Sequence, residues 1–196
     1  MTLGRLRAVL EGRVPGSFPF DRLRPEHLPP GGLARAAVLV PLFEHDGEPH
    51  VLLTVRPGHL KRHAGQVSFP GGRVEQGEDP RAAALREAEE EIGLERARVE
   101  LLGQLDETLV LTSGFRLTPW VAVVPYPYPY AARPGEVEAI LYLPLSALAR
   151  PGAHRTEHRD AYGERHLVHF YDLPGLTIWG ATARILDQLL VLWSAR

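Results

Sequence analysis

Apolar residues recur at helical spacing near both ends of the chain. The first pattern predicts a short amphipathic helix over residues 2–12, and the last predicts an amphipathic helix over residues 178–193. In each pattern the apolar side chains share one face, so we expect both helices to pack against a core. The apolar positions are Leu3, Leu6, Val9 and Leu10 in the first helix, and Ile185, Leu186, Leu189, Leu190 and Trp193 in the last.

A continuous apolar run at residues 36–43 is typical of a strand that is buried on both faces. Asp46 and Gly47 then supply a turn, and residues 50–56 predict a second strand, so we expect a hairpin. Similar runs predict the later strands. These lie near residues 99–105, 117–124, 139–143 and 166–172.

A third helix is predicted over residues 80–91, because both of its ends carry strong signals. Asp79 is suited to cap the helix, Pro80 to occupy its first position and Gly93 to end it. Strands that are interleaved with helices in this way predict an α/β fold, with a sheet covered on both faces.

Two segments rich in proline interrupt these patterns. Residues 15–32 predict an arm, so we divide the chain into an N-terminal helix and Pro/Gly-rich arm over residues 1–32 and one domain over residues 33–196. The arm is either an ordered wrap over the core or a loose leader. Residues 125–130 alternate Pro with Tyr and predict a stiff surface strap, the alternative being tyrosines that stack on a nucleobase.

The composition excludes several classes of chemistry. The 196 residues include no cysteine, which excludes disulfides, a thiolate nucleophile and cysteine-ligated metals. No apolar run approaches the roughly 18 residues that span a bilayer. The net charge is −2, so we predict neither a membrane nor a nucleic-acid partner. The absence of cysteine fits a reducing cytosol, so we expect a cytoplasmic protein. His154, His158, His166 and His169 show no zinc-binding spacing with a third ligand.

The small net charge results from two adjacent blocks of opposite sign. Residues 55–74 carry a charge of +4 with no acid, and residues 75–91 carry a charge of −5. The first block contains Arg56, Lys61, Arg62 and Arg73, and Lys61 is the only lysine in the chain. The second block includes the whole of the predicted helix over residues 80–91.

Three glutamates of that helix share one face. Glu87, Glu90 and Glu91 stand at positions i, i+3 and i+4, where like charges oppose helix formation. Carboxylates suit hard divalent cations such as Mg²⁺ or Mn²⁺, which would reverse that repulsion. For the helix alone, a solvated acidic face is the simpler interpretation. The opposite, apolar face is predicted to comprise Ala82, Leu85, Ala88 and Ile92.

The spacing around these glutamates resembles the signature of the Nudix hydrolase family. Among its fixed positions, only Ala88 is smaller than the aliphatic residue that is usual there. The resemblance implies the Nudix fold, an α/β/α sandwich with a mixed β-sheet, and a metal-dependent pyrophosphohydrolase. The matching residues are Gly72, Glu78, Arg86, Glu87, Glu90, Glu91, Gly93 and Leu94.

The resemblance also implies roles for these residues. Glu87 and Glu91 are the expected direct ligands of Mg²⁺ or Mn²⁺, and Glu90 is a third ligand or binds through water. A backbone carbonyl at Gly71 or Gly72 completes the metal site. Arg86 is expected to orient the catalytic carboxylates, and Glu78 to support the site. The general base is left open between Glu87 and a later loop acid, Glu136 or Glu138, for which ordinary surface positions are the alternative.

A second resemblance concerns the basic block. Residues 52–56, Gly65 and residues 69–72 are similar to a signature of the coenzyme A pyrophosphatase branch of the family, and residues 36–42 and 178–186 also resemble this branch. Two positions depart from it, because Pro57 replaces a small residue and Lys61 replaces arginine. The residues expected to bind substrate phosphate are Arg56, Lys61 and Arg62.

The function implied is hydrolysis of the diphosphate bond of coenzyme A, or of acyl-coenzyme A, to adenosine 3′,5′-bisphosphate and 4′-phosphopantetheine or its acyl form. The partner is thus a small phosphorylated nucleotide. The alternatives are a Nudix hydrolase of ADP-ribose or a dinucleotide, a Nudix-fold module that binds nucleotides without turnover, and a structural protein with an acidic helix. A homodimer is one assembly that the sequence allows.

Overall fold

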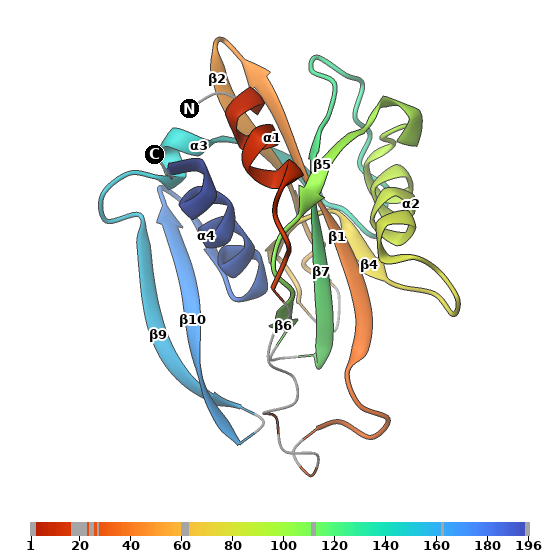
Figure 1. Ribbon diagram of the computed structural model, residues 1–196, viewed down its shortest axis with the longest axis vertical. Helices are drawn as coiled ribbons and strands as arrows, with labels where there is room; N and C mark the ends of the chain where they lie inside the picture. Colours follow the sequence, from red (N-terminus) through yellow and green to blue (C-terminus); the bar gives the residue numbers. More distant parts are fainter. Residues whose placement is uncertain are drawn as a thin grey trace.

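The computed structural model describes residues 3–16, 23, 26, 28–59, 63–110, 113–161 and 163–194. At its centre is a mixed sheet built around β1 (Ala34–His45), as Figure 1 shows. β1 pairs antiparallel with β2 (Glu48–Val55) and parallel with β7 (Phe115–Val123). The predicted hairpin of β1 and β2 is therefore confirmed.

In the described part of the chain, five further strands complete the central sheet, and three more form a second sheet. The central sheet also contains β3 (Val67–Ser68), β4 (Gly71–Arg73), β5 (Glu100–Gln104), β6 (Thr108–Val110) and β8 (Ala139–Pro144). A second, antiparallel sheet contains β9 (His154–Ala161), β10 (Glu164–Leu173) and β11 (Leu176–Trp179). The helices are α1 (Leu3–Glu11), α2 (Pro80–Ile92), η3 (Arg96–Arg98), α3 (Leu145–Leu148) and α4 (Ala181–Ser194).

The alternation of side chains along β1 divides the interior into two apolar clusters. Val38, Val40 and Leu42 belong to the cluster that also contains residues of α1 and α4, whereas Leu39 and Phe43 belong to the cluster that contains residues of α2. Figure 1 shows α2 on one side of the sheet and α1 with α4 on the other. The predicted α/β/α sandwich is confirmed.

The ends of α2 lie within one residue of those predicted. Asp79 Oδ1 accepts a hydrogen bond from the Arg81 amide at 2.8 Å, and Gly93, at φ 68°, donates its amide to Glu89 O at 3.0 Å. The predicted apolar face was wrong in part, because Ala82 is exposed and Leu85 only half-buried. The sheet-facing residues are Ala83, Ala84, Ala88, Glu91 and Ile92.

The predicted last helix was wrong at its start. Residues 176–179 form β11, which pairs with β10, and the chain turns at Gly180 with φ 68° before α4 begins at Ala181. Sequence patterns also missed β9, most of whose residues are exposed and which lacks the alternation of a half-buried strand.

At the N-terminus, α1 packs into the core rather than standing apart from it. Its residues Leu3, Leu6 and Leu10 are buried, and Leu10 lies against Gly103 of β5, where an added Cβ would approach the Leu10 Cβ to 3.0 Å. Beyond α1, the side chain of Arg13 pairs with Asp106. Much of the arm lies outside the described residues, and the division at residue 32 stays a prediction. No described helix is long and apolar enough to cross a membrane.

Candidate active site

Two glycines of β4 bring the backbone against α2. Strand pairing places Gly71 opposite Val38 and Gly72 opposite Ala37 of β1. A Cβ at Gly71 would lie 2.6 Å from the Val38 Cα, and one at Gly72 would lie 2.5 Å from Glu87 Cδ. Glycine at position 71 therefore allows close approach to β1, and glycine at position 72 allows the Glu87 carboxylate to lie directly against the strand.

Glu91 is buried beside this strand. Glu91 is only 7% exposed, and its Oε2 accepts a hydrogen bond from the Gly71 amide at 3.0 Å. Burial raises the pKa of Glu91 to about 7, although the Gly71 hydrogen bond lowers it, and the charge of Glu87 raises it further. A carboxyl group in this position is not part of a solvated face, and a cation would stabilise its charged form.

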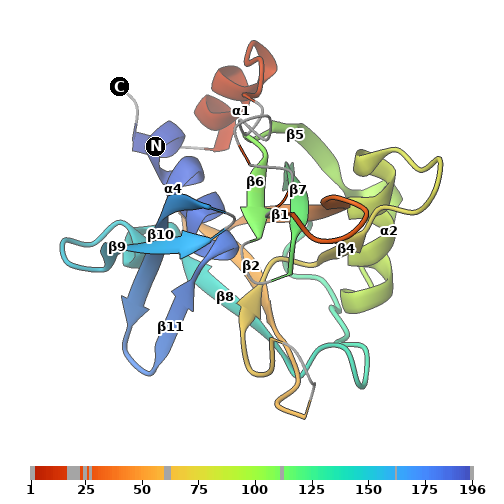
Figure 2. The ribbon, with the colours of Figure 1, turned by 90° about the horizontal axis from the view of Figure 1, so that it is seen from below.

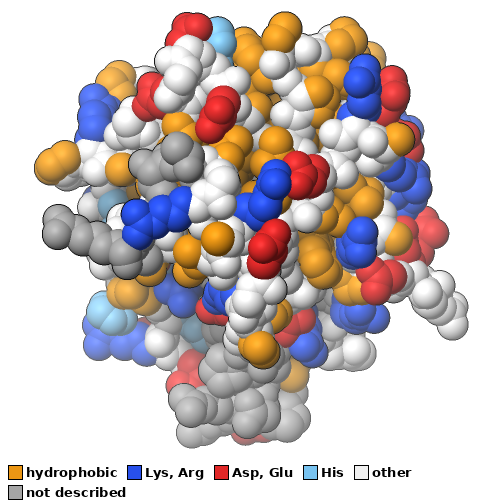
Figure 3. All heavy atoms as spheres, turned by 45° about the horizontal axis from the view of Figure 1, so that its top comes forward, with side chains coloured by type: hydrophobic (Ala, Val, Ile, Leu, Met, Phe, Trp, Pro, Cys, Tyr) orange, Lys and Arg blue, Asp and Glu red, His pale blue; other side chains and the backbone are white. Residues whose placement is uncertain are grey.

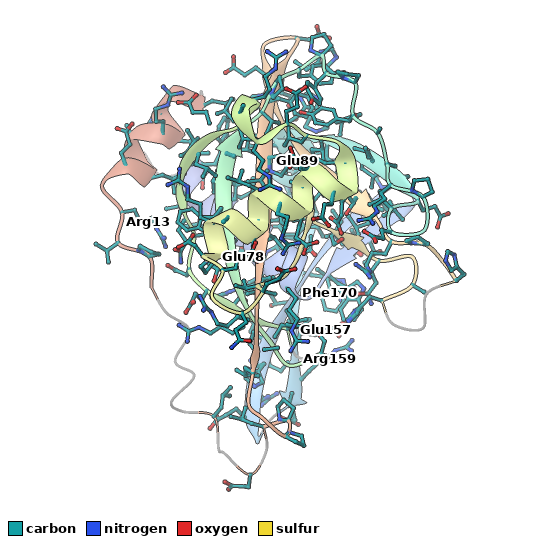
Figure 4. All side chains as sticks on the ribbon, turned by 90° about the vertical axis from the view of Figure 1, so that its right-hand side faces the viewer. Arg13, Glu78, Glu89, Glu157, Arg159 and Phe170 are labelled. Carbon is teal, nitrogen blue, oxygen red and sulfur yellow. The ribbon has the colours of Figure 1, made fainter. Side chains whose placement is uncertain are left out.

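Arg86 connects the carboxylates of the site. Its Nε and Nη2 donate to the two oxygens of Glu78 at 3.0 and 3.1 Å, and its Nη1 donates to Glu87 Oε1 at 2.7 Å. Glu90 Oε1 lies 3.5 Å from the same Nη1. The hydrogen bonds that Arg86 donates lower the pKa of Glu78, and the two acceptor carboxylates, Glu78 and Glu87, raise the pKa of Arg86. Figure 4 shows Glu78 near the start of α2, so Arg86 ties the preceding loop to the helix.

The two loop acids differ in their surroundings. Glu136 pairs with Arg133, whose Nη1 lies 3.3 Å from Glu136 Oε2 and 3.5 Å from Glu90 Oε2. The charge of Glu136 also raises the pKa of Glu91, which places Glu136 near the buried carboxyl group. Glu138 Oε2 instead accepts a hydrogen bond from the Gly58 amide at 3.0 Å.

A cavity of about 690 Å³ borders Gly71 and Gly72 and extends between the two sheets toward the start of α4. Figure 2 shows the surrounding strands from below. The cavity lining is mostly apolar, and its charged members comprise one acid, Asp160, and four arginines. These arginines are Arg56, Arg73, Arg159 and Arg184.

Of the three predicted phosphate-binding residues, Arg56 lines this cavity. Its Nε is buried and has no hydrogen-bond partner among the described residues, and its charge lowers the pKa of Glu91. Lys61 and Arg62 lie outside the described residues. The structure thus brings Arg56, which directly follows β2, together with the acidic site.

Sequence patterns missed the contribution of the second sheet to the cavity. Arg159 and Asp160 lie in β9, which carries no apolar repeat, and Arg184 lies in α4, to which the sequence patterns assign no site residue. The tyrosine strap does not line the cavity. Tyr126 stacks on Phe43 with ring centroids 4.3 Å apart, and Tyr128 donates its hydroxyl to Gly93 O at 3.0 Å, so these rings hold the loop.

The fold and the acidic site define a class of protein. Residues 33–164 match the NUDIX domain family, and the chain belongs to the Nudix hydrolases, an enzyme family of pyrophosphohydrolases. Among its relatives is a protein named uncharacterized Nudix hydrolase NudL from Shigella flexneri, which is 38% identical over 172 residues, or 87% of this chain and 88% of that protein. NudL of Escherichia coli K12 is 38% identical over 156 residues, or 79% and 80% of the two chains.

Solved structures support the fold. An Ap4A hydrolase of C. elegans in a binary complex has a TM-score of 0.50 at 22% identity, covering 58% of this chain and 82% of that one. The Nudix hydrolase RenU of M. smegmatis has a TM-score of 0.51 at 22% identity, covering 62% and 79%. The enzyme described here therefore acts on a nucleoside diphosphate derivative, as a Nudix hydrolase.

Proposed function

We propose that this enzyme hydrolyses the diphosphate bond of coenzyme A, and of acyl-coenzyme A, to adenosine 3′,5′-bisphosphate and 4′-phosphopantetheine or its acyl form. The observation that carries the proposal is the cavity that borders Gly71 and Gly72, the glycines beside Glu87 and Glu91, and is lined by four arginines. Such a cavity suits a diphosphate with a further phosphate group, because several separated cations face one continuous space.

Mg²⁺ or Mn²⁺ is the proposed cofactor, and the donor set fits either ion. The proposed ligands are Glu87, Glu90 and Glu91 with one backbone carbonyl, all of them oxygen donors. The ion supplies a Lewis acid that offsets charge on the diphosphate and acidifies water. The fit rests on the buried carboxyl group of Glu91 and on the missing Cβ of Gly72.

The strand register favours Gly71 over Gly72 as the source of the carbonyl ligand. One hydrogen bond lies at each end of the pairing between β1 and β4. Leu39 N donates to Pro70 O at one end, and Val74 N donates to Arg35 O at the other. The alternation of an antiparallel ladder then turns the polar groups of Gly72 toward Ala37 and those of Gly71 away from β1. The hydrogen bond from the Gly71 amide to Glu91 agrees with this direction.

The other residues position the diphosphate and the attacking water. Arg86 holds Glu87 and Glu78 in place, and Arg56 supplies a positive charge that acts on Glu91. For the general base we propose Glu87 or Glu136. Glu138 is the weaker candidate, because its carboxylate accepts the Gly58 amide. Lys61 and Arg62 stay proposed phosphate ligands.

The test is a substrate panel with Mg²⁺ or Mn²⁺ that contains coenzyme A, dephospho-coenzyme A, ADP-ribose, NADH and a dinucleoside polyphosphate. We expect the highest kcat/KM with coenzyme A, and expect phosphorus NMR to identify its two products. A clear preference for ADP-ribose or a dinucleotide would overturn the substrate assignment. Binding without turnover of any member would instead support a non-catalytic nucleotide-binding module.

A further inference from the structure

Three polar side chains from the second sheet and α4 form a cluster at the far side of the cavity wall. His154 of β9, His169 of β10 and Asp187 of α4 each place a nitrogen or oxygen within 4.8 Å of the other two. His154 Nε2 lies 3.0 Å from His169 Nδ1, and these nitrogens lie 3.8 and 3.6 Å from the Asp187 oxygens. His169 is buried, and burial lowers its pKa, which favours the neutral imidazole.

Arg184 fixes the tautomer of His169. Its Nη1 lies 3.0 Å from His169 Nε2. A guanidinium has only donors, so Nε2 must accept this hydrogen bond, and the proton of the neutral ring must be on Nδ1. His169 Nδ1 then donates to His154 Nε2, beside Asp187. The result is a directed chain of hydrogen bonds that starts at the Arg184 side chain.

The same tautomer argues against a metal site in this cluster. Ligand atoms of a tetrahedral zinc site lie roughly 3.3 Å apart, since each Zn–N bond is about 2.0–2.1 Å, and the three observed separations fall near that value. However, a metal on His169 Nδ1 would require a proton on Nε2, which would oppose the Arg184 donor. In the observed arrangement, the cluster therefore positions the Arg184 guanidinium through His169 instead of binding a metal.

The guanidinium of Arg184 is available to a ligand. Arg184 is exposed, lines the cavity, and forms no ion pair within the part of the chain that the structure describes. By contrast, Arg159 Nη2 lies 3.1 Å from Glu157 Oε2. Figure 4 shows Arg159 beside Glu157 and Phe170. The charge of Arg56 lowers the pKa of Glu91, and Arg73 follows Gly72 in β4. These two arginines therefore belong to the end of the cavity where the diphosphate is proposed to bind.

We propose that Arg184 binds the phosphate monoester of a substrate that carries one beyond its diphosphate, and that His169 and Asp187 are positioning residues for its guanidinium. The proposal rests on the proposed function, because coenzyme A carries such a group on its ribose. It assigns substrate discrimination to a residue that is about a hundred positions from the acidic helix in sequence, and outside the predicted basic block.

The first experiment compares Arg184→Gln with wild type on coenzyme A and dephospho-coenzyme A. Loss of a charged contact to phosphate should raise KM for coenzyme A about tenfold, with kcat and the constants for dephospho-coenzyme A little changed. Arg98→Gln is the control, since Arg98 is exposed in η3 and does not line the cavity. Equal effects of Arg184→Gln on both substrates would overturn the proposal.

A second pair of variants tests the positioning role. Gln at residue 169 can place an acceptor near the position of His Nε2, whereas Leu cannot. His169→Leu should therefore raise KM for coenzyme A severalfold, and His169→Gln should restore most of it at similar thermal stability. If both variants change KM equally, or if wild type binds Zn²⁺ tightly and His169→Leu does not, the positioning role is wrong.

Binding without turnover separates this proposal from the proposed function. Calorimetry should show that wild type binds adenosine 3′,5′-bisphosphate more tightly than AMP, and that Arg184→Gln removes the difference. Retention of this preference in Arg184→Gln would contradict the phosphate contact even if coenzyme A is hydrolysed. Failure of wild type to hydrolyse coenzyme A, with the preference present and lost in Arg184→Gln, would reject only the proposed function.

Discussion

Glu91 is a proposed metal ligand whose burial also lowers the stability of the fold when its carboxyl group is charged. Its carboxyl group is buried, accepts one amide hydrogen bond and lies next to the charge of Glu87. Sequence spacing could place Glu91 on a helix face with the other glutamates. It could not show that this face turns into the interior, because burial depends on β4, which contacts α2 from a separate segment.

The buried carboxyl group predicts a pH dependence of stability without metal. The folded pKa of about 7 exceeds the ordinary value of 4.5, so the folded state binds more protons between these values. The free energy of unfolding should thus fall as pH rises from 4.5 to 7, by about 3 kcal/mol from this group. Glu91→Gln should remove that contribution.

The measurement is urea unfolding with a chelator at pH 5 and pH 8. The change in the free energy of unfolding between the two pH values is compared for wild type and Glu91→Gln. Glu89→Gln is the control, because Glu89 pairs with Arg96 on the outer side of α2. Parallel pH dependences for wild type and Glu91→Gln would show that Glu91 ionises normally in the fold.

Gly72 predicts a loss of activity with little loss of structure. A Cβ at this position would meet the Glu87 carboxylate at 2.5–2.7 Å, so Gly72→Ala should displace the carboxylate. A shift of about 1 Å in a catalytic group can reduce turnover roughly a hundredfold, and we expect a loss of that size in kcat. Gly12→Ala is the control, because a Cβ there meets nothing within 4 Å. Near-normal kcat for Gly72→Ala would refute the packing argument.

At the scale of elements, the prediction from sequence was most accurate where residues at the ends of an element mark its bounds. α2 was predicted within one residue because Asp79, Pro80 and Gly93 are adjacent to its ends. The last helix was predicted to start too early, because Ile178 and Trp179 continue its apolar pattern but belong to β11, where they pair with Tyr171 and Phe170 of β10. The acidic site was predictable from spacing within one segment, whereas the Arg184–His169–Asp187 cluster required two elements to meet.

The cap of α2 provides a prediction at this scale. Asp79→Ala removes the acceptor for the Arg81 amide and should lower the free energy of unfolding by about 1 kcal/mol. Glu95→Ala is a matched control, since Glu95 precedes η3 without a side-chain capping bond. Equal small effects of both substitutions in urea unfolding would show that Asp79 contributes nothing as a cap.

At the scale of the whole molecule, the net charge of −2 does not show how the charges are distributed between the surface and the cavity. Acidic and basic side chains are interspersed on the face shown in Figure 3, without one dominant sign. The cavity, by contrast, is lined by four arginines and one acid, and it borders Gly71, whose amide binds the buried carboxylate of Glu91. This distribution fits a small phosphorylated substrate better than an extended polyanion.

The central claim is that Glu87 supports metal-dependent hydrolysis beside Gly71 and Gly72 of β4. The most direct test is the Mg²⁺-dependent turnover of coenzyme A by Glu87→Gln, with Glu89→Gln as a control of equal charge change on the same helix. We predict that Glu87→Gln lowers kcat at least about a hundredfold while Glu89→Gln stays close to wild type. Turnover of Glu87→Gln near the wild-type rate would contradict the account.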